Sequence, residues 1–397
     1  MPENIHTPDR ASLGHLRILE YGGIPSSYAT RWLGDLGADI IKIEPLKGDP
    51  NRLLPPFANN IEDPERSLSF INANLNKRSI ALDIVGSPKD KETFLQLIET
   101  ADALIESNNP GYLEELGLGQ EILLGRNQRL VTTSITPFGE TGPYAAYKGS
   151  HAIVEALSGF MSVHGDDLMP PVVTPNHITY QLAGVHSSYL TLAGIRHARR
   201  SGQGQKIDQA LTESISYMAM SAIARYSGRN EVLKRHGIKG QAGASNIFRC
   251  KDGKYISIGS IEPQFYKILR EIASLDDPAF DDQMSRSSWP ELKKQITKIF
   301  LQKSRDEWCK LMEGTDVCFS PVLDMSEAPN HPHNKARETF IEMEGVIQPA
   351  PAPRFSKTSP EVKSPPALVG EHTEEILMSL GIKDKEIKAL KSSGGVA

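Results

Sequence analysis

Cysteine is scarce in this sequence. The three cysteines, Cys250, Cys309 and Cys318, include no CxxC pair. So few cysteines without paired spacing argue against a disulfide framework or a zinc site, and they predict a reduced, cytoplasmic setting. No metal site is therefore expected.

Long hydrophobic runs are also lacking. No stretch reaches the roughly 18 apolar residues of a transmembrane helix, and the polar first residues do not form the apolar segment of a signal peptide. Positive charge is not in excess, because 44 Lys and Arg stand against 49 Asp and Glu. We therefore expect no nucleic-acid partner and no membrane association.

The chain does contain enough apolar residues for large cores, with 39% hydrophobic residues over 397 positions. This length predicts two domains, or one large domain with an insertion. Up to about residue 210, strand-like and helix-like patterns alternate, which indicates an α/β fold with a Rossmann-like parallel sheet. Strands are expected at 16–20, 39–44, 79–84, 103–105 and 131–135, with helices at 29–36 and 89–99.

The character of the sequence changes after about residue 227. A strand at 255–259 and two amphipathic helices within 265–300 predict a smaller α+β domain. The stretch near 329–334 is expected to be a loop, and the proline-rich stretch after it has too many apolar and charged residues for a simple low-complexity linker. Helices are expected again at 373–380 and 383–390.

The first β-α-β unit resembles a dinucleotide site only in part. Its turn contains Gly22 and Gly23, with Ser26 or Ser27 as the expected cap of the next helix. It lacks GxGxxG, whose glycines let the backbone approach a pyrophosphate. The sequence therefore favours a Rossmann-like scaffold used for another purpose.

Several polar residues are candidates for a ligand site, each with a structural alternative. Lys42, Lys77 and Arg78 could bind phosphate groups or lie on a solvated surface. The loop 136–144, with two glycines, could approach a ligand or form an ordinary turn. Four histidines, including His151 and His177, fall within 36 residues but have no metal or nucleophile spacing, which favours structural roles.

A series of motifs runs along the whole chain. Those of the first half are LGDLGADIIKIEP at 33–45, GDPNR at 48–52, NKRSIALD at 76–83, SITPFGETGPY at 134–144 and GQKID at 204–208. The second half adds motifs such as IEPQFY at 261–266 and PAPRF at 351–355. This series resembles CoA-transferase family III, the CaiB/BaiF superfamily that also includes acyl-CoA racemases, and the second half is most similar to the 2-methylacyl-CoA racemase branch.

The resemblance implies an arrangement of domains and subunits. A large Rossmann-like CoA-binding domain would comprise residues 1–225 and the C-terminal segment 330–397, with a small α+β domain at 226–329 between them. Two subunits would be threaded through one another like linked rings. Coenzyme A or an acyl-CoA would be a substrate, and no cofactor would be bound permanently.

The resemblance also implies CoA contacts. Lys42 matches a cationic contact, Leu75, Asn76, Lys77 and Arg78 match the segment around the adenosine and its phosphate, and Thr136 lies at the glycine-loop site. Two departures remove positive charge. Where the family has Asn-Phe-Arg-Pro-Gly, this sequence has SNNPG at 107–111. At the position of a further arginine that contacts CoA in the family, this sequence has Glu115.

The aspartate on which the family's chemistry depends falls at Tyr180. In transferases this aspartate attacks the thioester, and in racemases it works with a histidine on the α-carbon. The racemase histidine falls at Ser150, next to His151, and Glu262 matches the glutamate that supports it. A one-residue shift would bring His177, Asp166 or Asp167 nearby.

Three hypotheses follow from the resemblance. The first is a non-catalytic subunit that pairs with an aspartate-bearing paralogue in a heterodimer or heterotetramer, as in transferases of the succinyl-CoA:(R)-benzylsuccinate type. The second is a 2-methylacyl-CoA racemase or epimerase. The third is a non-enzymatic acyl-CoA-binding protein.

Overall fold

The computed structural model describes residues 11–165, 169–235, 245–285, 287–352 and 354–392. The chain forms two compact units, each of which is described by itself. The first comprises Met1–Phe160, Val173–Ser221 and Arg337–Ala397, and the second comprises Met161–Val172 and Ala222–Ala336.

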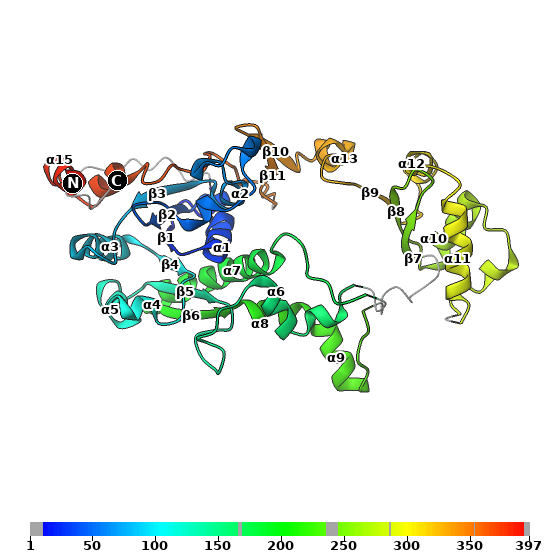
Figure 1. Ribbon diagram of the computed structural model, residues 1–397, viewed down its shortest axis with the longest axis horizontal. Helices are drawn as coiled ribbons and strands as arrows, with labels where there is room; N and C mark the ends of the chain where they lie inside the picture. The colour runs from blue at the N-terminus through cyan, green and yellow to red at the C-terminus, as the bar shows by residue number, and fades with distance from the viewer. Residues whose placement is uncertain (1–10, 166–168, 236–244, 286, 353, 393–397) are drawn as a thin grey trace. The chain divides into compact units, whose positions relative to one another are not determined.

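A six-stranded parallel sheet forms the centre of the first unit within the described residues, in the order β3-β2-β1-β4-β5-β6 (Figure 1). The expected α/β class with a parallel sheet is confirmed. The strands are β1 Arg17–Tyr21, β2 Asp39–Glu44, β3 Lys77–Ala81, β4 Ala103–Glu106, β5 Val131–Thr136 and β6 Gln205–Ala210.

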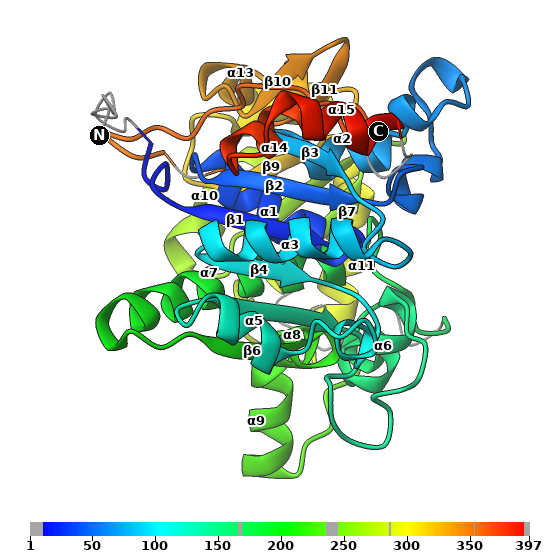
Figure 2. The same ribbon diagram turned by 90° about the vertical axis from the view of Figure 1, so that its left-hand side faces the viewer.

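Helices cover both faces of this sheet (Figures 1 and 2). Alternate residues of each strand point to opposite faces, so Leu19 and Ile41 pack in one core and Ile18 and Ile40 in the other. Helices α3, α5 and α14 contribute to the first core, and α1 and α7 to the second. The helices are α1 Ile24–Asp35, α2 Leu68–Asn74, α3 Pro88–Thr100, α4 Tyr112–Glu115, α5 Gln120–Arg126, α6 His151–Leu157, α7 Ile178–Ser201, α8 Leu211–Met218, α14 Thr373–Ser379 and α15 Asp384–Ser392.

Two sequence expectations about local structure are wrong. Helix α1 begins at Ile24 after Gly23, so Ser26 and Ser27 lie inside the helix and do not cap it. Pro25 stands in the first turn, where its missing N–H costs no hydrogen bond. Within the stretch near 329–334 expected as a loop, the short helix α13 begins at Pro332. The hairpin of β10 (Phe340–Met343) and β11 (Val346–Pro349) follows it.

The C-terminal segment closes the β3 edge of the first unit. Asn76 donates to the carbonyl of Glu361 and accepts from the backbone N–H groups of Lys363 and Ser364. Further along, the N–H of His372 donates to the carbonyl of Ser79. Residues almost 300 positions apart therefore complete one fold.

The second unit has an antiparallel three-stranded sheet in the order β7-β8-β9. Its core contains Trp308, Phe300 and Phe248, whose rings pack edge-on or tilted. The expected small α+β unit is confirmed. Its elements are β7 Ser245–Arg249, β8 Tyr255–Gly259, α10 Pro263–Ala273, α11 Trp289–Phe300, α12 Arg305–Met312, β9 Phe319–Val322 and α13 Pro332–Ala336, with most of α9 Met220–Arg229.

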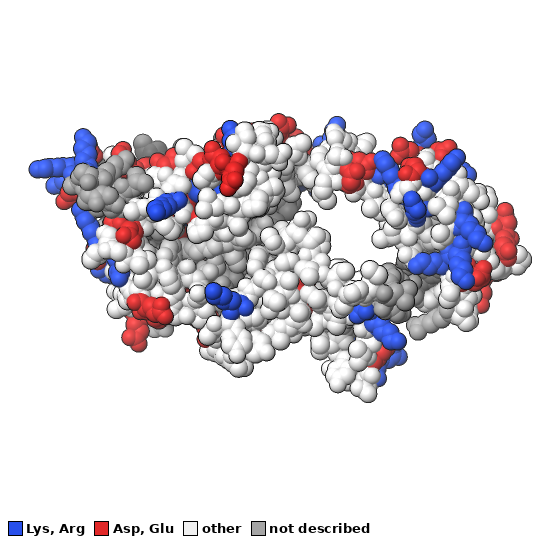
Figure 3. Space-filling model, in the orientation of Figure 1, with Lys and Arg blue, Asp and Glu red and all other residues white. Residues whose placement is uncertain are grey.

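The surface shows few concentrated charges. Most of the first unit's face in Figure 3 is uncharged, and its charged side chains are scattered singly or in small groups. Across the residues described, no helix combines the length and apolar character needed to cross a membrane.

Candidate active site

The residue at the expected nucleophile position lies in the first turn of α7. The chain enters this helix through Asn176 and His177, both with positive φ angles, and His177 is the N-cap. Thr179 and Tyr180 follow, and the start of α6 packs beside them. We call His151, Glu155, His177, Thr179 and Tyr180 the α7 site.

Tyr180 carries a phenol that is already engaged. Its hydroxyl oxygen accepts a hydrogen bond from the backbone N–H of His151 at 3.2 Å. Burial raises the pKa of Tyr180, and the hydrogen bond from His151 offsets this only in part. Because a phenol ordinarily ionises near pH 10, almost no phenolate is present at neutral pH.

His151 is held by two side chains. Its Nδ1 lies 2.9 Å from Thr179 Oγ1 and 3.6 Å from Glu155 Oε1. Glu155 is fully buried and also accepts hydrogen bonds from the backbone N–H and the hydroxyl of Thr174. The carboxylate of the α7 site is therefore committed to Thr174 and to the imidazole.

His177 lies against both aromatic neighbours. Its ring centre is 5.4 Å from that of His151 and 5.6 Å from that of Tyr180. Burial lowers the pKa of His177, and the nearby His151 lowers it further. His177 is thus present mainly as the neutral imidazole at neutral pH.

Ser107 lies against the turn after β1, at the edge where doubly wound sheets bind ligands. The strand order reverses between β1 and β4, and ligands bind outside the carboxyl ends of such strands. The Oγ of Ser107 accepts from the N–H of Gly23 at 2.9 Å. A Cβ at Gly22 would lie 2.6 Å from the Ser107 nitrogen, so Gly22 admits this close approach.

Two of the predicted cationic residues meet inside the protein. Lys42 Nζ lies 2.7 Å from one oxygen of Glu20, and Lys77 Nζ lies 2.8 Å from the other. All three side chains are at most 3% exposed, and we call them the Glu20 cluster. Burial alone would raise the pKa of Glu20, but the two ammonium groups outweigh burial and hold that pKa well below its usual range.

The pKa values of the two lysines are shifted in opposite directions. Burial would lower the pKa of Lys42, but Asp49 and Glu20 raise it above its usual value. Burial dominates at Lys77 and lowers its pKa to about 8 despite Glu20. Both ammonium groups face carboxylates of this chain.

The other predicted CoA contacts lie elsewhere. Arg78 pairs with Asp39 and Glu375, so it does not join the Glu20 cluster. Leu75 is fully buried, and Asn76 binds the C-terminal segment. Thr136 is buried at the end of β5, and its hydroxyl accepts the N–H of Gly139, which fixes the glycine loop.

The remaining candidates are spread over the chain. Glu262 is exposed in the second unit, where it is the N-cap of α10. Asp166 and Asp167 lie outside the described residues. Glu115 is exposed at the end of α4. Sequence reasoning missed Glu155 and Thr179, although the four-residue spacing from His151 to Glu155 is a usable signal on a helix.

Comparisons with known proteins identify the family. The model of CoA-transferase family III matches residues 13–373. The chain is 30% identical to human alpha-methylacyl-CoA racemase over 388 residues, which cover 96% of each chain. It is also 30% identical to succinyl-CoA:(R)-benzylsuccinate CoA-transferase subunit BbsE of Thauera aromatica, over 96% of this chain and 97% of that protein.

A solved structure shares the fold. The crystal structure of a CAIB/BAIF family protein from Brucella suis has a TM-score of 0.83 and 25% identity, and it covers 92% of this chain and 98% of that chain. The resemblance expected from the motifs is confirmed. This chain belongs to CoA-transferase family III.

Proposed function

We propose that this chain is a subunit of a CoA-transferase that moves CoA between an acyl-CoA thioester and a free carboxylic acid. A paralogous subunit supplies the nucleophilic aspartate. In such a transfer a carboxylate attacks the thioester carbonyl, CoA thiolate leaves and a mixed anhydride forms. Tyr180, with its raised pKa and engaged hydroxyl, is the observation that carries this proposal.

The neighbouring carboxylate does not replace the aspartate. Glu155 is fully buried and is bound by Thr174. Attack on a thioester would require it to leave these hydrogen bonds and the imidazole of His151. The α7 site of this chain is therefore proposed to be inactive in transfer.

Related proteins with several subunits support a heteromer. The chain is 29% identical to the beta subunit and 28% identical to the alpha subunit of succinyl-CoA–L-malate CoA-transferase from Chloroflexus aurantiacus. The first unit also exposes large apolar side chains, as interaction surfaces do. On α6, α7 and α8 these are Ile153, Leu157, Ile178, Val185, Tyr189, Tyr217 and Met218.

The quaternary arrangement and the ligand contacts are part of the same proposal. Two chains thread through one another, and the two compact units are the large and small domains of each subunit. In the assembled enzyme, acyl-CoA lies against the segment 75–78 and the Thr136 loop, while the buried Lys42 and Lys77 support this surface from within through Glu20. No permanently bound cofactor is involved.

Purification from the native source tests the subunit role. Native mass spectrometry should show two different chains, and succinyl-CoA with an acceptor acid should react only with the complex. Tyr180→Phe in this chain should preserve transfer, whereas replacing the paralogue's aspartate should abolish it. A homodimer of this chain that transfers CoA by itself would overturn the proposal.

A second candidate function, racemisation of a 2-methylacyl-CoA, is favoured by the environment of His151. Glu155 and Thr179 hold Nδ1, while Nε2 makes no hydrogen bond within the described structure. An imidazole oriented by a carboxylate is a suitable general base for an α-proton. The fully buried Glu155 would stabilise the imidazolium that forms.

Proton exchange separates the two candidates. A racemase would exchange the α-proton of a 2-methylacyl-CoA in deuterated water, and His151→Gln would stop the exchange while His177→Gln reduces it less. Acyl-CoA binding without exchange by the isolated chain eliminates racemisation.

A further inference from the structure

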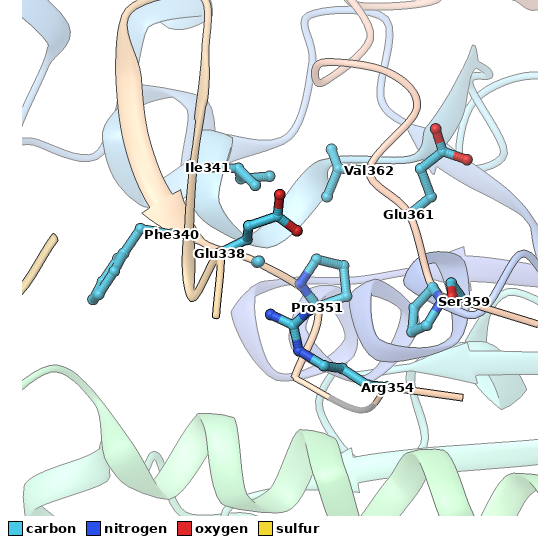
Figure 4. Close-up of a pocket in the computed structure, with 10 residues that line it drawn as sticks. Glu338, Phe340, Ile341, Pro351, Arg354, Ser359, Glu361 and Val362 are labelled. Carbon is cyan, nitrogen blue, oxygen red and sulfur yellow. The ribbon is translucent and has the colours of Figure 1, made fainter. Parts of the chain in front are cut away.

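A cavity of about 540 Å³ lies in the first unit beside the hairpin β10–β11 (Figure 4). Its volume falls within the range of small-molecule sites. None of the residues of the α7 site, the Glu20 cluster or the expected CoA contacts lines it. Two of its residues, Pro351 and Arg354, belong to the PAPRF motif at 351–355, to which neither candidate function gives a role.

Part of the cavity wall is apolar. Ile341 comes from β10, and Pro351, Pro360 and Val362 come from the segment that follows the hairpin. These four side chains are partly exposed, so water reaches them when the cavity holds no ligand. Contact with an apolar group of a ligand would remove water from both surfaces, which is favourable.

Two opposite charges face the same space. In Figure 4 the carboxylate of Glu338 and the guanidinium of Arg354 both point into the cavity beside Pro351, whereas the carboxylate of Glu361 points away from it. Across the described residues, neither Glu338 nor Arg354 forms an ion pair with the other or with a third side chain. Both side chains are exposed and therefore accessible to a ligand.

We infer that this cavity binds an α-amino acid with an apolar side chain. Arg354 donates to the α-carboxylate, for which its planar guanidinium offers two parallel N–H groups. Glu338 accepts from the α-ammonium group. The apolar side chain lies against Ile341 and Val362. A ligand that carries both charges bridges two protein groups that do not pair with each other, and this complementarity selects a zwitterion over a simple acid or amine.

Calorimetry with the full-length chain tests the class of ligand. L-Leucine should bind, and three compounds that each lack one of its features should bind about tenfold more weakly or worse, because each loses a charge-assisted contact or the apolar contact. Isocaproate lacks the ammonium group, isoamylamine lacks the carboxylate, and glycine lacks the apolar side chain. Absence of leucine binding, or equal binding of isocaproate or isoamylamine, would overturn the inference.

Substitutions test the two charged contacts separately. Arg354→Gln and Glu338→Gln should each weaken leucine binding about tenfold. Glu338→Gln should not weaken the binding of isocaproate, since this acid has no ammonium group for Glu338 to accept from. Leucine binding that survives both substitutions would exclude this cavity as the site.

Glu361→Gln is the matched control, because Glu361 lines the same cavity but its carboxylate points away. It should change leucine binding by less than twofold. Thermal unfolding should show that all three variants are folded, since the replaced side chains are exposed. The inference does not rest on the subunit role, because the first unit contains the whole cavity.

Discussion

The Glu20 cluster and the α7 site both place ionisable side chains inside the first unit, but they differ in how completely their charges are paired. In the Glu20 cluster each carboxylate oxygen faces an ammonium group at 2.7–2.8 Å. In the α7 site a phenol, two imidazoles and one carboxylate lie together without such charge pairing, and Glu155 Oε1 is 3.6 Å from His151 Nδ1. Full charge pairing indicates a structural role, whereas partial pairing leaves groups that can still take part in chemistry.

Breaking the Glu20 cluster should give the largest effect. Glu20→Gln leaves Lys42 and Lys77 buried without their shared carboxylate, and removing one partner of a buried ion pair costs about 3–5 kcal/mol. Denaturant unfolding measures the loss of free energy. The control is Asp39→Asn, since Asp39 pairs with Arg17 and Arg78 near the surface and should cost about 1 kcal/mol or less. Equal losses in both variants would contradict the structural role.

Acid should weaken the same cluster. The folded-state pKa of Glu20 lies below its unfolded value of 4.5, so its contribution is complete above 4.5 and is lost progressively as pH falls from there through the folded-state pKa. The free energy of unfolding should therefore decline below about pH 4.5 more steeply in the wild type than in Glu20→Gln. Parallel pH profiles for the two proteins would exclude this source of acid sensitivity.

Tyr180→Phe should have a smaller effect on stability. It removes the acceptor of the His151 N–H, and one such hydrogen bond contributes about 1 kcal/mol. Transfer by the native complex should stay unchanged, which separates this phenol from a catalytic group. A loss of transfer with folding intact would show that the hydroxyl takes part in the reaction.

The smallest expected change is a titration shift at His177. Burial is the larger cause of the lowered pKa of His177, and the neighbouring His151 is the smaller cause. His151→Gln should therefore raise the pKa of His177 without restoring its ordinary value. Proton NMR of the imidazole across the pH range measures the shift, and an unchanged pKa would rule out coupling between the rings.

The sequence predicted the sheet well and the polar interactions poorly. The run DIIKIE at 39–44 is β2 to the residue, because a short apolar run between turns suits a buried parallel strand. The pairing of Lys42 with Glu20 was not predicted, since it depends on the register of β1 against β2. The sequence placed Lys42, Lys77 and Arg78 in one candidate phosphate-binding group. In the structure, neighbouring residues of β3 point to opposite faces of the sheet, so Lys77 pairs with Glu20 and Arg78 with Asp39.

The hairpin β10–β11 shows a second limit of sequence reasoning. No strand was predicted here; Pro349 ends β11, and the proline-rich stretch begins at that residue. Proline is compatible with strand ends and edges. A cavity of about 450 Å³ lies between this hairpin and Leu75, which is more than 270 positions away from Gln348, so no local pattern could indicate it.

The closure of the β3 edge by residues 361–372 has a consequence for biosynthesis. The backbone and side-chain groups of Asn76 and Ser79 obtain these partners only after the ribosome has made residues 361–372. A nascent chain that ends at α12 carries an open sheet edge, and an open edge invites pairing with other chains. The synthesis of residues 361–372 thus sets the moment at which this edge of the sheet is closed to other chains.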